Sequence, residues 1–206
     1  MNTIVLKGDI IKSRGTDASV WLPAFKDLLA EYAGTEAVHW FVYEGDTFII
    51  EVIDTSHAID LAVLIKAWFI GFKNLNARIA IGVGNVSFKG DAIMEANGTA
   101  YSRAGDTLKT LKDAEQTLKV ESGNPNKDKT LNLLLQWLSS SVDHWNIKTA
   151  QAYFYRLAKP KATQAEIADQ MKIKSQSVIS EHLSRGGGAV IFNTLSYFSE
   201  EFTTLS

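Results

Sequence analysis

The sequence predicts an α+β protein in which a domain of strands and helices, residues 1–124, precedes an all-helical domain, residues 125–206. Short runs rich in Val, Ile and aromatic residues, which are typical of strands, are confined to the first part. In the second part the apolar residues recur at helical spacing. Between the two lies Ser122–Lys129, whose Gly, Asn, Pro and Lys residues favour a linker.

Composition is that of an ordinary globular protein. Of the 206 residues, 46% are hydrophobic and 21% are charged, and none is Cys, which excludes disulfides and thiolate metal sites and favours the cytoplasm. The start of the chain reaches Lys7 after three apolar residues and lacks the core of a signal peptide. The best candidate for a membrane span, Ile59–Phe72, is interrupted by Asp60 and Lys66. We therefore expect a soluble cytoplasmic protein with no membrane partner.

The formal net charge is −2, so no global basic field is present to hold nucleic acid. After residue 124, nine Lys and Arg residues oppose seven Asp and Glu residues, which leaves twelve against sixteen before it. The C-terminal part is therefore slightly basic, and any binding of DNA has to come from a local surface.

The first half of the N-terminal domain is expected to form a strand, a helix and a hairpin. Thr3–Leu6 is an apolar run typical of a buried strand, and a Gly-Asp pair ends it. Across Val20–Tyr32 apolar residues recur at helical spacing, with a Pro tolerated in the first turn. Ala37–Val42 and Thr47–Ile53 flank a three-residue turn and predict a hairpin.

The second half continues with alternating helices and strands. A Thr-Ser pair can cap a second helix at residues 55–72, and Ala77–Val83 predicts the next strand. Gly98–Lys112 is expected to be a third helix and Thr117–Glu121 a last strand. The resulting order begins as the split βαβ pattern of ferredoxin-like domains.

The helical domain contains the sharpest local pattern in the chain. Thr163 and Glu166 form a capping box that opens a short helix, and Lys172–Lys174 makes a turn. Ser175 caps a second helix, which the Gly186–Gly188 run stops. This pattern predicts a helix-turn-helix at residues 163–185. The other helices are expected at Leu131–Leu138, Thr149–Leu157 and Ala189–Phe198.

The second helix of this motif presents small polar and amide groups suited to phosphates and base edges. Its basic count is low, so we expect useful affinity from a homodimer, whose two copies bind two half-sites. The competing interpretation is a three-helix unit that only packs or dimerises. The predicted DNA-binding residues are Lys172, Lys174, Ser175, Gln176, Ser177, Ser180 and Arg185.

Several segments resemble a known family. LKGDIIKSR near the start, YEGDTF in the hairpin, and ARIAIGVGNVSFKG followed by NGTAYSRAGDTL are similar to the SatD family of bacterial proteins. TQAEIADQMKIKSQSVISEHL resembles the helix-turn-helix of that family. SatD-like N-terminal domains in turn resemble the palm of class III nucleotide cyclases, in which two aspartates bind metal ions. The resemblance places Asp9 and Asp46 in these metal-binding positions and implies a nucleotide ligand with Mg²⁺ or Mn²⁺.

Strand pairing supports this pair of aspartates independently. In a ferredoxin-like sheet the first strand lies antiparallel beside the second hairpin strand, so Asp9 and Asp46 converge at one edge. Paired carboxylates bind Mg²⁺ and leave its other positions to water and phosphates. Gly8 and Gly45 would let a phosphate approach the backbone, and Arg14 or Lys12 would meet the outer phosphates. The competing interpretation makes Asp46 a turn residue only.

The departures from the cyclase pattern weaken the case for catalysis. Ser102 stands where cyclases have the Asn that orients the ribose, and Asp106 stands where they have the transition-state Arg. A carboxylate cannot stabilise developing negative charge on a phosphoryl group. Arg103 is close in sequence but lies roughly 100° around the helix from that position. We therefore keep Ser102 and Arg103 as candidates for nucleotide binding and assign no catalytic residue.

Three hypotheses follow from the sequence. The first is a DNA-binding transcription regulator whose N-terminal domain senses a ligand, such as a nucleotide with Mg²⁺, or dimerises. The second is an enzyme that makes or breaks phosphoanhydride or cyclic nucleotide bonds, and the third is a purely structural assembly module. The helix-turn-helix favours the first, and the aspartate pair favours the second.

Overall fold

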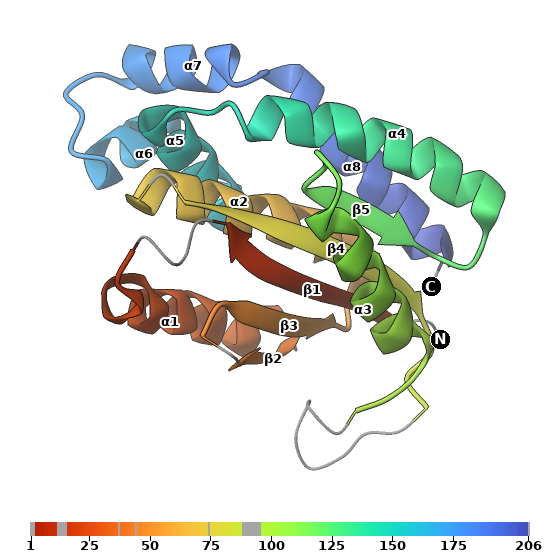
Figure 1. The fold of residues 1–206 in the computed structure, drawn as a ribbon. Helices are drawn as coiled ribbons and strands as arrows, with labels where there is room; N and C mark the ends of the chain where they lie inside the picture. Colours follow the sequence, from red (N-terminus) through yellow and green to blue (C-terminus); the bar gives the residue numbers. More distant parts are fainter. Residues whose placement is uncertain are drawn as a thin grey trace.

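The computed structural model describes residues 3–11, 16–36, 38–43, 45–73, 75–87 and 96–205. Within these residues the chain is a mixed α+β protein with a five-stranded sheet and eight α-helices (Figure 1). The elements are, in chain order, β1 Thr3–Ile11, α1 Ala18–Glu36, β2 Val38–Tyr43, β3 Thr47–Val52, the 3-10 turn η2 Thr55–His57, α2 Ala58–Lys73, β4 Asn76–Gly84, α3 Thr99–Lys112, β5 Leu118–Glu121, α4 Pro125–Val142, α5 Ile147–Ala158, α6 Gln164–Gln170, α7 Gln176–Arg185 and α8 Ala189–Leu205.

The strands lie in the order β2-β3-β1-β4-β5. β2 and β3 form the predicted antiparallel hairpin, and β1 runs antiparallel to both β3 and β4. β5 pairs parallel with β4 at the far edge. The hairpin and the pairing of β1 with β3 are therefore confirmed, and the sheet is mixed because of β5.

Helices cover both faces of the sheet. α1 and α2 pack on the face that carries Ile4 and Leu6, and α3 packs on the face that carries Val5 (Figure 1). α3 lies directly against β4 because Gly82 has no side chain. A Cβ at Gly82 would stand 2.1 Å from the carbonyl oxygen of Ala100. Close packing of α3 against β4 therefore explains why residue 82 is glycine.

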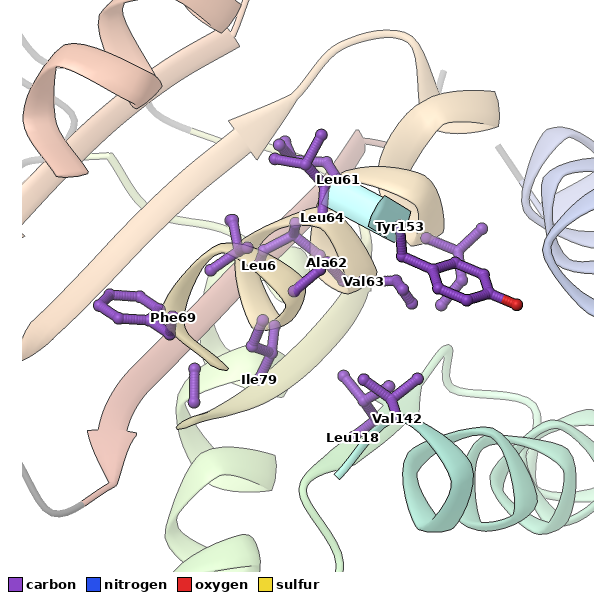
Figure 2. Packing of buried hydrophobic residues seen from close by; sticks show 14 of the residues in the cluster. Leu6, Leu61, Ala62, Val63, Leu64, Phe69, Ile79, Leu118, Val142 and Tyr153 are labelled. Carbon is purple, nitrogen blue, oxygen red and sulfur yellow. The ribbon is translucent and has the colours of Figure 1, made fainter. Parts of the chain in front are cut away.

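α2 is buried on nearly all sides, which explains its almost continuous apolar sequence. Figure 2 shows Leu6 and Ile79 of the sheet near one side of α2, and Tyr153 and Val142 of the C-terminal helices near the other. One hydrophobic core thus extends through both predicted parts of the chain. Among the described residues, Thr55–Lys73 is long and apolar enough to cross a membrane, but 72% of its most apolar window is buried, as in a core helix of a soluble protein.

The boundary between the two parts differs from the prediction. Ser122–Lys129 was expected to be a linker, but α4 already begins at Pro125. The side chain of Asn124 accepts a hydrogen bond from the Lys127 amide, and Pro is favoured in the first helical turn. The Asp128 carboxylate accepts hydrogen bonds from Ser122. Local capping therefore overrides the linker-like composition.

α4 also closes one edge of the sheet. The Asn132 side chain accepts a hydrogen bond from the Val120 amide, at 2.8 Å, and donates one to the Val120 carbonyl oxygen, at 2.9 Å. A side-chain amide thereby replaces the hydrogen bonds that a further strand would make with β5. The sheet ends at this contact.

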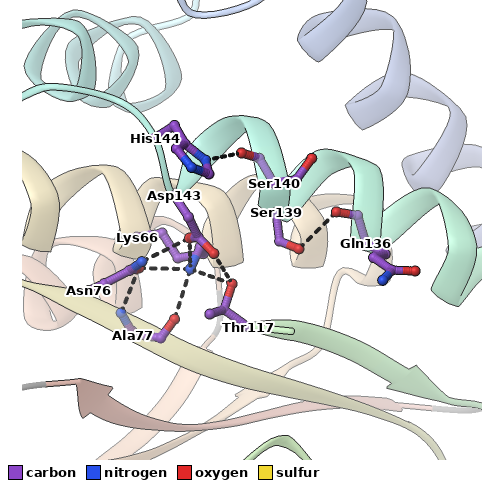
Figure 3. A network of polar contacts seen from close by, with 9 residues as sticks. All are labelled: Lys66, Asn76, Ala77, Thr117, Gln136, Ser139, Ser140, Asp143 and His144. Carbon is purple, nitrogen blue, oxygen red and sulfur yellow. Dashed lines mark hydrogen bonds and ion pairs between the residues drawn. The ribbon is translucent and has the colours of Figure 1, made fainter. Parts of the chain in front are cut away.

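A buried lysine joins α2 to the sheet and to α4 (Figure 3). The Lys66 side chain is 0% exposed, and its Nζ lies 2.7 Å from Asn76 Oδ1, 2.8 Å from the Ala77 carbonyl, 3.0 Å from Thr117 Oγ1 and 2.7 Å from Asp143 Oδ1. Burial lowers the pKa of Lys66, and the Asp143 carboxylate opposes that shift. Asp143 is the C-cap of α4, so the network fixes the end of this helix against the start of β4.

Candidate functional site

Asp9 and Asp46 lie at the same end of the sheet, on neighbouring segments. Asp9 is opposite Thr47 in the pairing of β1 with β3. The next residue, Ile10, donates its amide to the Asp46 carbonyl oxygen at 3.0 Å. Asp46 belongs to the turn before β3, so strand alternation does not set the direction of its side chain. The backbone thus brings the two predicted metal-binding residues together at one end of the strands.

The side chain of Asp9 lies beside two cations. It lies on the α3 face, where Arg78 Nη1 is 3.4 Å and Lys112 Nζ 3.9 Å from Asp9 Oδ2. Lys7 is on the same face of β1, with its Nζ 5.7 Å from the centroid of the Tyr43 ring. Asp9 Oδ1 is buried and has no hydrogen-bond partner. The arrangement has excess positive charge suited to a phosphate and one carboxylate oxygen available to a cation.

Metal binding needs more than this one oxygen. The described residues contain no group of three His, Cys, Asp or Glu side chains that could hold a metal ion. The unpaired Oδ1 of Asp9 is suited to ligating Mg²⁺, while Arg78 beside Oδ2 opposes a second positive charge. Phosphate oxygens would have to complete any metal site at this edge.

The glycines of this region have structural reasons to be glycine. A Cβ on Gly8 would lie 2.3 Å from Cζ of Phe48 and 2.7 Å from the Arg78 carbonyl oxygen. Gly45 has φ +81°, a turn conformation that L side chains rarely adopt. Core packing and the turn therefore explain both residues without a bound phosphate.

Ser102 and Arg103 lie away from Asp9. Arg103 Nη1 donates to the Val83 carbonyl, at 2.6 Å, and to the Ser122 carbonyl, at 2.8 Å. Val83 pairs with Ile4 whereas Asp9 pairs with Arg78, so the two ends are separated by five residues of β4, roughly 17 Å. Ser102 is exposed and its hydroxyl donates to the Thr99 carbonyl. The described structure does not bring these residues to Asp9, and Arg14 and Lys12 lie outside the described residues.

The α6–α7 unit is the second candidate site. Both halves of the predicted capping box are present, since the Thr163 amide donates to Glu166 Oε2 at 2.7 Å and the Glu166 amide donates to Thr163 Oγ1 at 3.2 Å. Lys172, with φ 54°, makes the turn after α6, and Ser175 caps α7. Sequence predicted each of these features. α7 contacts both α5 and α6, and its apolar residues face inward.

Two hydrogen bonds from aromatic side chains hold the C-terminal end of α7. Tyr153 of α5 donates its hydroxyl to the Leu183 carbonyl at 2.8 Å, and Trp145 donates its indole N–H to the Gly186 carbonyl at 2.8 Å. The two rings stack with centroids 4.1 Å apart. Burial raises the pKa of Tyr153 to about 12, so it remains a hydrogen-bond donor at neutral pH.

The outward side of this unit is polar and open. All seven predicted DNA-binding residues are exposed: Lys172, Lys174, Ser175, Gln176, Ser177, Ser180 and Arg185. The hydroxyls of Ser175 and Ser177 bond to each other at 2.7 Å, and Arg185 pairs with Glu181 one turn earlier. Gln176 and Ser180 make no side-chain hydrogen bond within the described part of the chain and are available to an outside partner.

Sequence reasoning missed cations at both sites. Lys159 and Lys161 line a hollow of about 370 Å³ at the corner between α5 and α6, next to the capping box. The Lys-Pro-Lys break was a signal for an exposed basic corner. Arg78 and Lys112 gave no such signal, because they meet Asp9 only through the pairing of β1 with β4 and the packing of α3.

Comparisons with known proteins do not identify the chain. No family profile matches it, and no curated protein is detectably similar to it. Its function has to be argued from the two sites.

Proposed function

We propose that this protein is a cytoplasmic, DNA-binding transcription regulator of the SatD type that acts as a homodimer. The observation that carries the proposal is that α7 is amphipathic, with one apolar buried side and one polar exposed side. Ile179 and Leu183 are buried, whereas Gln176, Ser177 and Ser180 are exposed. A helix that is seated by its apolar side and projects short polar groups outward fits a major groove. The α6–α7 unit then serves as a helix-turn-helix.

The proposed contacts separate by role. Lys172, Lys174 and Arg185 would hold phosphates, and Arg185 would exchange its partner Glu181 for one. Gln176, Ser177 and Ser180 would reach base edges, and Ser175 would both cap α7 and donate to a phosphate. Few cations are available per copy, so affinity requires two copies with α7 helices about 34–36 Å apart or a multiple of that spacing.

The outer faces of α4 and α8 offer a surface for the second copy. These helices lie side by side and antiparallel, since Lys127 Nζ is 3.2 Å from Glu201 Oε2 at one end and Ser141 Oγ is 3.5 Å from the Gly186 carbonyl at the other. Trp137 is 72% and Val190 70% exposed, and Leu133 and Tyr197 are exposed as well. These four uncharged residues can pair with themselves across a two-fold axis. We expect Trp137→Glu to convert a dimer into a monomer in light scattering.

A salt-titrated mobility shift tests DNA binding. The DNA upstream of the protein's own reading frame and a random duplex are titrated at several salt concentrations. Lys172→Ala should weaken binding to both and reduce the slope of log K against log salt by about one counterion, whereas Lys129→Ala on α4 should leave the slope unchanged. Gln176→Ala should alter preference between the two duplexes by roughly 1–3 kcal/mol. No binding at low salt would leave α6–α7 as a packing unit of a structural module.

A second candidate function is nucleotide binding by a ferredoxin-like, palm-like N-terminal domain. β1 and β2 run parallel with β3 between them, and β3 and β4 run parallel with β1 between them, which is the double split βαβ arrangement. The specific support is the buried Oδ1 of Asp9, which has no hydrogen-bond partner, together with the two cations beside Oδ2 of the same carboxylate. Asp9 and Asp46 would hold Mg²⁺ or Mn²⁺, and the ion would neutralise phosphate oxygens. With Asp106 at the transition-state position, we propose binding without cyclisation.

Thermal melting with ATP or GTP, with and without Mg²⁺ or Mn²⁺, tests this second function. Binding to the native state raises the melting temperature by mass action. Asp9→Asn should remove the metal-dependent part of the shift, and Asp113→Asn, an exposed residue after α3, should retain it. No shift at millimolar nucleotide and metal would exclude the nucleotide site while leaving the DNA-binding proposal intact.

A further inference from the structure

A cavity of about 410 Å³ lies where α2, α5 and α8 meet. Its volume is within the range of small-molecule sites, roughly 300–1,000 Å³. Apolar walls come from Leu157 and Pro160 on and after α5 and from Phe192 and Leu195 on α8. The cavity is separate from both the Asp9 edge and the exposed face of α7.

The polar groups of the cavity carry opposite charges. Asp60, in the first turn of α2, and Arg156, near the end of α5, both line it, together with the hydroxyl-bearing Ser196 and Ser199. Asp60 and Arg156 form no ion pair with each other within 4.0 Å. Arg156 donates through Nη1 to the Ala162 carbonyl at 2.9 Å, which orients the guanidinium.

Asp60 is the incompletely satisfied member of this group. No described residue hydrogen-bonds to its carboxylate, and burial raises its pKa while the nearby His57 opposes that shift. Asp60 is partly buried rather than enclosed. A titratable side chain with a perturbed pKa that lines a pocket with apolar walls is a common property of binding sites. A cationic group placed in the cavity would supply the partner that the chain does not.

We propose that this cavity binds a small zwitterion with an apolar side chain, of the α-amino acid class. The ammonium would be held by Asp60 and the carboxylate by Arg156, with the two serine hydroxyls as further hydrogen-bond partners. The apolar side chain would lie against Phe192 and Leu157. A separated pair of opposite charges favours a ligand with both charges over a simple amine or a simple acid.

The cavity is also connected to α7. The ring of Phe192 stacks on that of Tyr153, with centroids 5.5 Å apart, and Tyr153 donates its hydroxyl to the Leu183 carbonyl of α7. A ligand that contacts Phe192 would bias the position of this ring pair and so of α7. Control of DNA affinity by the ligand rests on the proposed function, whereas ligand binding itself does not.

Binding is tested on the full chain without DNA, by thermal melting and calorimetry. The probes are the common apolar L-amino acids, with 3-methylbutan-1-amine and 4-methylpentanoate as ligands that carry one charge only. We expect at least one amino acid to raise the melting temperature in a concentration-dependent way and both single-charge compounds to bind at least tenfold more weakly. Absence of any shift at 10 millimolar, or equal binding of the amine alone, would overturn the assignment.

Two variants locate the site. Asp60→Asn should abolish the shift yet melt no lower than the wild type without ligand, because it removes a partly buried charge to which no described residue hydrogen-bonds. Asp113→Asn should leave the shift unchanged. An amino acid that still stabilises Asp60→Asn binds elsewhere and contradicts the proposal. A ligand that binds through Asp60 but leaves the DNA mobility shift unchanged would refute only the coupling between the cavity and α7. If the protein binds no DNA with or without the ligand, only the proposed DNA-binding function is refuted.

Discussion

Lys66 and Asp60 are two charged residues on the same buried helix, six positions apart, and they are treated in opposite ways. Four oxygens surround the Lys66 ammonium, and they come from β4, the segment before β5 and the end of α4. No described residue hydrogen-bonds to the Asp60 carboxylate, which faces a cavity instead. Lys66 therefore has its partners within the chain and stabilises the fold. The carboxylate of Asp60 can accept a partner from outside the chain.

The physical basis of this contrast is the cost of burying an ion. A buried charge loses several kcal/mol of hydration, and only well-placed partners offset that loss. Around Lys66 the partners also bond to one another, because Thr117 Oγ1 donates to Asp143 Oδ2 at 2.6 Å and Asn76 Nδ2 donates to Asp143 Oδ1 at 2.8 Å. Removing one member therefore leaves others unsatisfied. No described residue hydrogen-bonds to the Asp60 carboxylate, so replacing it leaves no such group unsatisfied.

The largest effect expected is that of Lys66→Met. This change leaves Asp143 and three other acceptors without their cation, so the free energy of unfolding should fall by about 3–5 kcal/mol. Urea denaturation measures the loss. Lys73→Met, at the exposed end of the same helix, should stay within about 0.5 kcal/mol of the wild type. Equal stability of the two variants would contradict the structural role given to Lys66.

Thr117→Val should have an intermediate effect. It removes one acceptor of Lys66 and one donor to Asp143, and each buried group left without a partner costs about 1–3 kcal/mol. Thr110→Val on the exposed side of α3 is the matched control. In a double mutant with Lys66→Met, the Thr117 effect should shrink, because the two residues belong to one network. Full additivity would show that they act independently.

Asp60→Asn should stabilise the unliganded protein. Burial raises the pKa of Asp60 above its ordinary value of 3.8, so the folded state binds the proton more tightly than the unfolded state. The wild type should therefore lose stability as the pH rises from below 3.8 through the raised pKa, and the variant should not. His57 is the nearby group that opposes the shift, so His57→Gln is combined with Asp60→Asn to isolate its contribution. Melting curves between pH 3 and pH 7 give the measurement.

The smallest effect is expected at the exposed Glu166 of the capping box. Hydrogen bonds from the Thr163 amide and hydroxyl lower the pKa of Glu166 below its ordinary value of 4.5. Its contribution to stability should be present above pH 4.5 and disappear as the pH falls through the lowered pKa. Thr163→Ala should cost about 1 kcal/mol at neutral pH and weaken this pH dependence without abolishing it, because the backbone amide of residue 163 still donates to Glu166. A variant as stable as the wild type would mean that α6 does not depend on its cap.

Sequence predicted the features that are local or that follow from strand order. The hairpin, the capping box and the exposed polar side of α7 are each encoded within one short continuous stretch of the sequence. The meeting of Asp9 with the turn at Asp46 required only the correct pairing of β1 with β3. These predictions succeeded because turn chemistry and helix capping act over a few residues.

Contacts between distant segments could not be predicted in this way. Lys66 appeared only as an interruption of an apolar helix, since its partners lie at positions 76, 77, 117 and 143. Sequence makes Arg103 a candidate for nucleotide binding, but tertiary packing directs its side chain to the carbonyls of Val83 and Ser122. Sequence could not predict that Asp60 and Arg156 line the same cavity, because three helices form that cavity together.

Asn132 blocks the β5 edge of the sheet, so a further strand could add only at the opposite edge, at β2. Hydrogen bonding to Val120 leaves no template for another strand at the β5 edge. At the opposite edge, no backbone hydrogen bond reaches the outer side of β2 from the described residues. Its sequence, VHWFVY, contains no Pro or Lys, which commonly block strand addition. Self-templating of partially folded chains should therefore begin at Val38–Tyr43, and a Pro placed there would halt fibril growth without replacing a residue of any of the three proposed binding sites.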